Sequence, residues 1–289
     1  MSVFNLGSLN IDRVYRTNHF VRPGETITCS SYAEFAGGKG LNQSIALARA
    51  GADVIHIGKI GQDGISLKNL LEQNNVNTQN IFVTDKPSGH AIIQVDDHGE
   101  NAIVLYGGAN QAITSNEIQL GLKSAQTGDW LLLQNETNRI KEAIHLGAER
   151  GLKIVFNPAP MEKEVSSLPF QDISWLIVNE LEGEMISGEK TPKKIAQNIL
   201  NRFPDISIVV TRGAKGVYFA NNSNEFSLPA EKVPVIDTTG AGDTFIGFFI
   251  AELSDNKPVK DSLIIASKAA AACVSKPGAA NSIPSRSSL

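Results

Sequence analysis

The sequence predicts an α/β fold, a doubly wound and mostly parallel sheet with helices on both faces, together with a small antiparallel β lid. Short, continuous apolar runs alternate along the chain with segments whose apolar residues recur at helical spacing. Uninterrupted apolar runs are typical of strands buried on both faces, as in a parallel sheet. Two other segments, residues 14–35 and 89–107, have strand character without a helical pattern.

The first third of the chain supplies two strands and two helices to this prediction. The strands are expected over residues 3–6 and 54–57, which are short apolar runs. Residues 40–50 are expected to form a helix because their apolar side chains recur every three or four positions, and residues 65–73 show the same spacing.

The second half of the chain continues the alternation. Four more buried strands are expected, at residues 130–133, 153–156, 175–178 and 208–210. Helices are expected between them, at residues 138–150, 182–186 and 193–203. Because parallel neighbours need crossover connections, this alternation predicts parallel pairing.

The two segments without helices are expected to form the lid. Residues 89–107 read as a hairpin whose turn is Asp96-Asp97-His98-Gly99. We therefore assign residues 1–13, 36–88 and 108–289 to an α/β nucleotide- and sugar-binding domain, and residues 14–35 and 89–107 to the lid. The pattern alone fits a lid over the active edge of the sheet and an ordinary peripheral insertion equally well.

Composition excludes several classes of protein. A formal net charge of -4 and a pI near 5.8 argue against a nucleic-acid or polyanion ligand. The two cysteines, Cys29 and Cys273, predict neither a disulfide framework nor a metal site, and free thiols favour a reducing compartment. The chain starts without the basic segment of a signal peptide, and no stretch approaches the ~20 apolar residues of a membrane span. We expect a cytoplasmic protein that binds no membrane.

Polar residues follow nearly every expected strand. Any one of them is typical of an ordinary turn. In a doubly wound sheet, however, the carboxyl ends of parallel strands meet at one edge, where ligands bind. Taken together these residues therefore predict a ligand site, and they are Asn10 and Asp12, Asn135 and Glu136, Asn157, Asn179 and Glu180, and Thr211 to Gly213.

Several motifs of common enzyme classes are absent from the sequence. The chain has no GxxxxGK[ST] phosphate loop, and no GxGxxG follows the first strand. It also lacks HExxH, GxSxG and CxxC, and its five histidines form no ligand cluster. A phosphate-loop enzyme, a dehydrogenase and a zinc enzyme are therefore disfavoured.

A glycine-rich turn remains as the strongest candidate for phosphate handling. Gly240-Ala241-Gly242-Asp243 precedes an apolar helical run, so unpaired backbone N–H groups are expected at the positive end of a helix. Two roles fit Asp243. A carboxylate there is positioned to take the proton from a phosphoryl acceptor, or it simply caps the helix N-terminus.

Two motifs make the chain resemble a known family, the ribokinase-like (PfkB) carbohydrate kinases. FAGGKGLNQSIALARAG (residues 35–51) is similar to the first motif of that family, and DTTGAGDTFIGFF (237–249) is similar to the second. The resemblance covers nearly the whole chain in order, through GSLNID (7–12), PGET (23–26), GGAN (107–110), NPAP (157–160), NELE (179–182) and TRGAKG (211–216).

The resemblance implies an activity and a set of site residues. The activity is ATP-dependent phosphorylation of the primary hydroxyl of a pentose, with D-ribose, giving D-ribose 5-phosphate, as the first candidate. Asp243 would be the general base, and the backbone of Gly240, Ala241 and Gly242 the anion hole. The residues that would bind the sugar with Asp243 are Asn10, Asp12, Gly38, Lys39, Asn42 and Glu136. For Lys39 the residues alone also fit a solvated lysine at a helix start.

Nucleotide and cations are implied in the same way. ATP would lie against Asn179, Glu182, Thr211, Gly213 and Gly216, with Glu182 helping to place a hydrated Mg²⁺, although an acid at a helix start is also favourable by itself. The resemblance further implies K⁺ beside the anion hole and a homodimer that forms through the lid. The K⁺ site would comprise Asp237, Thr239, Cys273, Lys276, Gly278 and Ser282.

Two other functions remain open at this stage. One is a sibling kinase that phosphorylates deoxyribose, a fructose derivative or a nucleoside. The other is a non-catalytic sugar-binding regulator with the same fold, since fold does not determine function.

Overall fold

The structure, a computed structural model, describes all residues 1–289 and is built around a nine-stranded sheet. All strand pairs are parallel except the two made by β12. In spatial order the strands are β13 (Glu225–Leu228), β12 (Val217–Ala220), β11 (Ser207–Thr211), β10 (Trp175–Asn179), β9 (Lys153–Asn157), β8 (Trp130–Gln134), β1 (Val3–Leu6), β4 (Val54–Gly61) and β5 (Asn77–Thr84).

The strand order reverses between β1 and β8. From β1 the chain adds β4 and β5 on one side, and only later adds β8 to β11 on the other side. The loops after β1 and β8 therefore diverge at the carboxyl edge and leave room for a ligand.

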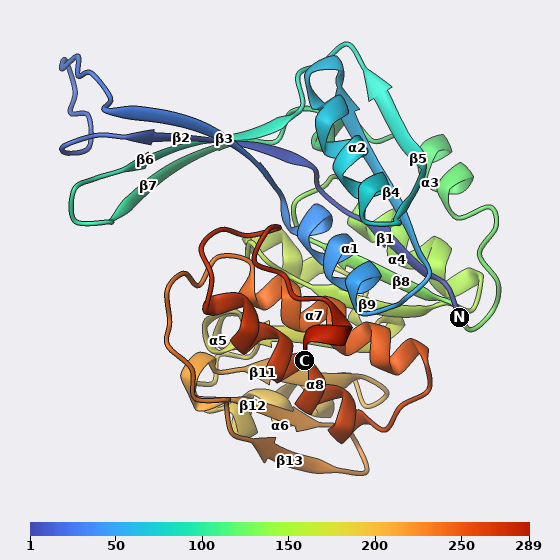
Figure 1. Ribbon diagram of the computed structural model, residues 1–289. Helices are drawn as coiled ribbons and strands as arrows, with labels where there is room; N and C mark the ends of the chain where they lie inside the picture. The colour runs from blue at the N-terminus through green and yellow to red at the C-terminus, as the bar shows by residue number, and fades with distance from the viewer.

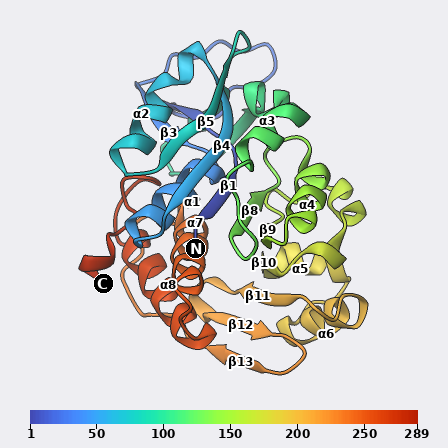
Figure 2. The same cartoon turned by 90° about the vertical axis from the view of Figure 1, so that its right-hand side faces the viewer.

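Helices cover both faces of the sheet (Figure 2). One face packs on α1 (Lys39–Arg49), α2 (Ile65–Gln73), α7 (Ala241–Ser254) and α8 (Val259–Val274). The other packs on α3 (Ser115–Gly121), α4 (Ile140–Glu149), α5 (Glu180–Ser187) and α6 (Pro192–Arg202). Neighbouring residues of a strand enter opposite cores, as with Val3 and Phe4 of β1, which explains why the central strands are mostly apolar on both faces.

A second sheet of four strands extends as an arm from the main body (Figure 1). It consists of β3 (Ser31–Gly37), β2 (Asn10–Arg16), β6 (Gly89–Val95) and β7 (Asn101–Tyr106), in that spatial order. The β2–β3 and β6–β7 pairs are antiparallel, and β2 joins them by pairing with β6 in parallel. Because β2 begins at Asn10 and β3 ends at Gly37, the base of the arm lies beside the carboxyl edge of the main sheet.

The expected fold class is confirmed, and every strand and helix predicted for the main sheet is present within a few residues of its expected bounds. The elements without a sequence prediction have weak signals. Strand β5 lies at the sheet edge, where its alternating exposed and buried residues lack the continuous apolar run used to identify buried strands. Helix α8 is rich in alanine, so its apolar face is poorly marked.

Candidate functional site

Two helices from distant parts of the chain begin at the carboxyl edge of the sheet and face one another. Helix α1 follows the glycines of the first motif, and α7 follows those of the second. Gly40 allows α1 to start against the loop after β1, because a Cβ at this position would lie 2.3 Å from the backbone nitrogen of Ser8. Gly247 allows α7 to pack on α1, where a Cβ would lie 2.4 Å from Cβ of Ala46.

Asp243 lies where these two helices meet, and it is only 8% exposed. Its Oδ2 accepts a hydrogen bond from Asn42 Nδ2 at 3.0 Å, and its Oδ1 accepts one from Gln43 Nε2 at 2.9 Å. The N-cap of α7 is Gly240, in a left-handed conformation, and no side chain caps this helix. Asp243 is therefore not the helix cap, and its carboxylate is directed to α1 instead.

The first turn of α7 presents unpaired backbone donors. The N–H of Ala241 reaches Thr238 O at 3.3 Å, and the N–H of Thr244 donates to Gly240 O at 2.8 Å. The N–H groups of Gly242 and Asp243 donate to no acceptor in the protein. A Cβ at Gly242 would meet no atom within 4 Å. Free donors, open space and the positive end of a 14-residue helix are features suited to an anion.

A group of polar side chains lies beside Asp243, at the base of the arm. Glu136 Oε2 accepts hydrogen bonds from the backbone N–H of Lys39 at 2.9 Å and from the Ser8 hydroxyl. Asn10 Oδ1 accepts one from Asn110 Nδ2 at 2.7 Å. Gly38, directly before Lys39, has a φ of 94°, a backbone conformation that favours glycine. Acceptors and donors thus converge from four segments of the chain.

Lys39 is the cation of this acidic site. Burial by itself disfavours the ammonium, yet the carboxylates of Asp243, Glu136 and Glu182 raise the pKa of Lys39 above its ordinary value. The side chain is therefore not a freely solvated lysine at a helix start. It lies within electrostatic reach of acids from α7, from the loop after β8 and from α5, so it links the regions predicted for sugar and for nucleotide.

Asp12, at the base of the arm, has an unusual ionisation. Burial, and secondarily the nearby Glu136 carboxylate, raises the pKa of Asp12 to about 6. Its carboxylate lies against Gly37, where a Cβ would be only 2.0 Å from Asp12 Oδ2. The ionised side chain is thus held in a crowded acidic site that opposes its charge.

This ionisation predicts a pH-dependent effect on stability. An acid whose pKa is raised on folding favours the folded state at low pH and loses that contribution as pH rises through the folded pKa. Asp12→Asn is therefore expected to stabilise the protein at pH 7.5, by ~1–2 kcal/mol after allowance for partial exposure, or ~2–5 °C in Tm.

Thermal unfolding of both proteins between pH 4 and pH 8 checks this expectation. The difference in Tm should be absent near pH 4, grow as pH rises to about 6 and stay constant above that pH. Asp97→Asn, on the exposed turn of the β6–β7 hairpin, is the control and should show no such trend. An equal difference in Tm at all pH values would contradict the explanation.

A cavity of about 550 Å³ opens next to the free N–H groups of α7. Its lining includes Thr211, Gly213 and Gly216, from the end of β11 and the loop after it, and Ala241 and Gly242 at the start of α7. The remaining wall is mainly apolar and includes Val217, Val233, Val235, Phe245, Ala270, Ala271 and Val274. A mostly apolar cavity of this size with a few polar groups is typical of a site for a small organic ligand.

Asn179 and Glu182 are paired with one another at the start of α5. The Asn179 side chain accepts from the N–H of Glu182 at 2.8 Å, and Glu182 Oε2 accepts from the N–H of Asn179 at 2.9 Å. This reciprocal capping shows that both residues have a structural role. Burial raises the pKa of Glu182 against the opposing effects of the Asn179 N–H and of Lys39, and Oε1 receives no hydrogen bond from the protein.

The six residues predicted for the cation lie together, where the turn before α7 meets the loop after α8. Asp237 Oδ1 accepts from Thr239 Oγ1 at 2.6 Å, and Asp237 Oδ2 accepts from Gly278 N at 2.8 Å. Although burial opposes ionisation, these hydrogen bonds lower the pKa of Asp237. The backbone of Cys273 accepts from Lys276 N at 3.1 Å, and its thiol lies 3.0 Å from Ser282 Oγ.

Sequence reasoning missed the residues that hold this site together. Gln43 and Asn110 occur in the quoted motifs GGKGLNQ and GGAN, but neither was assigned a role. Gln43 contacts Asp243, and Asn110 braces Asn10 while pairing with both the N–H and the C=O of Leu9. Membership in the motifs was the available signal, yet the partners become visible only in the fold.

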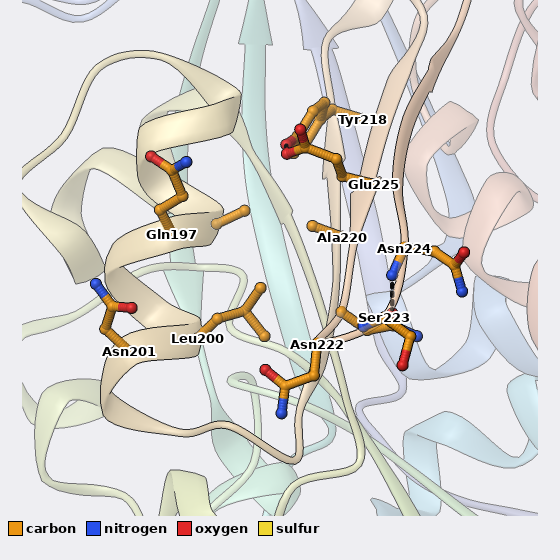
Figure 3. A pocket seen from close by; sticks show the side chains of 11 residues that line it. Gln197, Leu200, Asn201, Tyr218, Ala220, Asn222, Ser223, Asn224 and Glu225 are labelled. Atoms are coloured by element: carbon orange, nitrogen blue, oxygen red, sulfur yellow. Dashed lines mark hydrogen bonds between the residues drawn. The ribbon is translucent and has the colours of Figure 1, made fainter.

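Other features of the structure carry none of the predicted residues. A second hollow, between α6 and the β12–β13 hairpin, is lined by Gln197, Asn201, Tyr218 and the turn at residues 221–225 (Figure 3).

No group of three histidine, cysteine or acidic side chains is arranged to hold a metal ion. None of the helices has the length and apolar character to span a bilayer.

Comparisons with known proteins agree with the geometry. The model of the pfkB family carbohydrate kinases matches residues 2–286. A ribokinase of Haemophilus influenzae is 37% identical over 293 residues, which is 97% of this chain and 94% of the relative.

Two solved structures resemble the fold over nearly its full length. Ribokinase from Cryptococcus neoformans in complex with ADP has a TM-score of 0.85 at 36% identity, covering 99% of this chain and 98% of its own. Arabidopsis thaliana ribokinase complexed with ribose and ATP has a TM-score of 0.86 at 25% identity, covering 99% and 96%.

Proposed function

The chain belongs to the PfkB family of carbohydrate kinases, and from this premise we propose that it transfers the γ-phosphoryl group of ATP to the primary hydroxyl of D-ribose. The product is D-ribose 5-phosphate. One observation carries the proposal: a buried carboxylate, that of Asp243, stands beside free backbone N–H groups in the same helical turn. Phosphoryl transfer to an alcohol requires a proton acceptor and donors for the phosphoryl oxygens at neighbouring positions.

In the proposed mechanism Asp243 is the general base. Its carboxylate takes the proton of the primary hydroxyl as that oxygen bonds to the γ-phosphorus and the bond from phosphorus to the ADP oxygen breaks. The N–H groups of Gly242 and Asp243, with the Gly240–Ala241 backbone shaping the turn, stabilise charge on the transferred group. Lys39 offsets the negative charge of the surrounding acids and of the phosphates.

The remaining hydroxyls of the sugar are assigned to the polar group at the base of the arm. Asp12 and Glu136 offer acceptors, whereas Asn42 and Lys39 offer donors, which matches hydroxyls that do both. The backbone at Gly38 and the side chain of Asn10 complete the set. The support for this assignment is the convergence of these groups around Asp243.

ATP is assigned to the apolar cavity, with its phosphates directed to α7. The cavity lining supports this placement, because it combines Thr211, Gly213 and Gly216 with Ala241 and Gly242 of the anion-facing turn. Mg²⁺ would neutralise the phosphates. Glu182 fits an outer position around a hydrated ion, since one of its oxygens is free and hard cations prefer carboxylates, and Asn179 holds it there.

A monovalent cation, K⁺, is assigned to the group formed by Asp237 and its neighbours. An ionised carboxylate and the surrounding backbone carbonyls are oxygen donors of the kind a hard cation takes. The ion would place positive charge behind the anion site. The residues that would hold it are Asp237, Thr239, Cys273, Lys276, Gly278 and Ser282.

We further propose that the arm, residues 14–35 and 89–107, closes over the sugar site as a lid and mediates a homodimer. One of its two inner strands, β2, carries Asn10 and Asp12 at its base, so movement of the arm reaches the site directly. Its outer strand β7 exposes Ile103, Val104 and Leu105, an apolar surface suited to a second copy of the arm. The two free cysteines and the use of ATP support a cytoplasmic location.

A substrate panel tests the proposed reaction. ADP release should be fastest with D-ribose when compared with deoxyribose, fructose derivatives and nucleosides at equal concentration, and K⁺ should raise the rate. A tenfold higher kcat/KM for another substrate would identify a sibling kinase. Sugar binding without ADP release would indicate a non-catalytic regulator.

A further inference from the structure

A chain of buried polar side chains leads from the Asp243 carboxylate into the core. It runs through Gln43, Gln134, Asn5, Ser44 and His56, all of which are at most 1% exposed. Gln134 Nε2 donates to Gln43 Oε1 at 2.7 Å and to Asn5 Oδ1 at 2.9 Å. Asn5 Nδ2 donates to Ser44 Oγ at 2.8 Å, and Ser44 Oγ lies 2.8 Å from His56 Nδ1. The chain thus joins α1 and three adjacent strands, β8, β1 and β4.

The carboxylate determines how the nearest amides are oriented. An ionised carboxylate only accepts hydrogen bonds, so Gln43 must turn its NH₂ group to Asp243 and its oxygen to Gln134. That oxygen in turn requires the NH₂ group of Gln134, which also serves Asn5. A flipped Gln43 amide would lose two hydrogen bonds in a site without water access, so it has one orientation.

The far end of the chain is a buried imidazole. Ser44 Oγ accepts from Asn5 Nδ2 and lies 2.8 Å from His56 Nδ1, and the tautomer of the ring decides which of these two atoms donates. Burial lowers the pKa of His56 to about 4, so the ring stays neutral throughout the neutral pH range.

The two amides that hold Asp243 differ in their surroundings. In the proposed function Asn42 also contacts the sugar, so a bound substrate would compete with Asp243 for the hydrogen bond that Asn42 donates. Gln43 is fully buried, and its only other hydrogen-bond acceptor is Asn157 Oδ1, at the long distance of 3.5 Å. The one strong donation of Gln43 is to Asp243 Oδ1.

We propose that Gln43 is a positioning residue that, braced by Gln134 and Asn5, aims the Asp243 carboxylate at the sugar hydroxyl. This inference rests on the proposed role of Asp243 as general base. Gln43 touches neither reacting atom. It acts through the carboxylate, so its removal should alter turnover more than sugar binding.

Gln43→Met tests the proposal because methionine keeps the approximate volume and removes the donor. We expect kcat to fall by ~10-fold or more, which is the scale of one hydrogen bond to a charged group, while the KM for the sugar stays within about threefold. A fall in kcat at a nearly unchanged KM is the readout, because a loss of stability alone would not produce it.

Ser262→Ala is the matched control. Ser262 is fully buried in α8, far along the chain from the site, and its hydroxyl donates to Pro258 O at 3.0 Å. Losing that hydrogen bond should lower Tm without changing kcat. Gln134→Met, which removes only the brace, should lower kcat by a smaller factor, and it remains informative if Gln43→Met fails to fold.

Asp243→Asn, measured in the same assay, distinguishes the proposed role of Asp243 as general base from the proposed positioning role of Gln43. If it retains turnover, the proposed general base is wrong. If it abolishes turnover while the kcat values of Gln43→Met and Gln134→Met match the wild type, Asp243 keeps its role and the positioning role of Gln43 is overturned.

Discussion

Asp243→Asn is expected to lower kcat by ~10²-fold or more while sugar affinity stays within a few fold, because an amide cannot take the proton of the hydroxyl. The substitution preserves the size of a side chain that is 8% exposed. One of the two amide donors, Asn42 or Gln43, would then face another NH₂ group, so a modest decrease in Tm is expected too. ADP release gives kcat, and calorimetric titration with sugar gives affinity.

The control for this substitution lies on the same helix. Asp255→Asn changes an exposed acid at the other end of α7, where it pairs only with Lys257, and should leave kcat unchanged. If Asp243→Asn keeps more than about a tenth of the wild-type turnover, a general base at this position is excluded.

Gly242→Ala is expected to lower activity without lowering stability. A Cβ at this position meets no protein atom within 4 Å, and the helical backbone suits alanine, so Tm should stay unchanged or rise slightly. The space that the methyl group enters adjoins the free N–H groups assigned to the phosphoryl group. Turnover should therefore fall by ~10²-fold or more, the scale of losing one donor of an oxyanion hole.

Gly247→Ala provides the reciprocal case on the same helix. Its Cβ would lie 2.4 Å from Cβ of Ala46, so the added methyl group should force α7 from α1 and lower Tm. The comparison uses thermal unfolding and ADP release on both variants. A Gly242→Ala enzyme with wild-type turnover would show that no ligand approaches this turn.

Local patterns predicted most of the fold because each depends on few neighbours. The apolar runs of β8, β9, β10 and β11 marked buried parallel strands without knowledge of their partners. Likewise, the GAGD sequence predicted a turn followed by the start of a helix. Where local pattern was ambiguous, as at the edge strand β5 and the alanine-rich α8, it predicted no element.

The sequence by itself determined the alternating α/β architecture, the glycine turns and the family, since these depend on residue type and spacing. The tertiary structure alone decided that Asp243 is held by α1 and does not cap α7, because the two arrangements look the same along the chain. Its partners Asn42 and Gln43 lie 201 and 200 positions away. The raised pKa of Asp12 and the amide chain behind Gln43 likewise arise from burial and from contacts between distant segments, which no local spacing encodes.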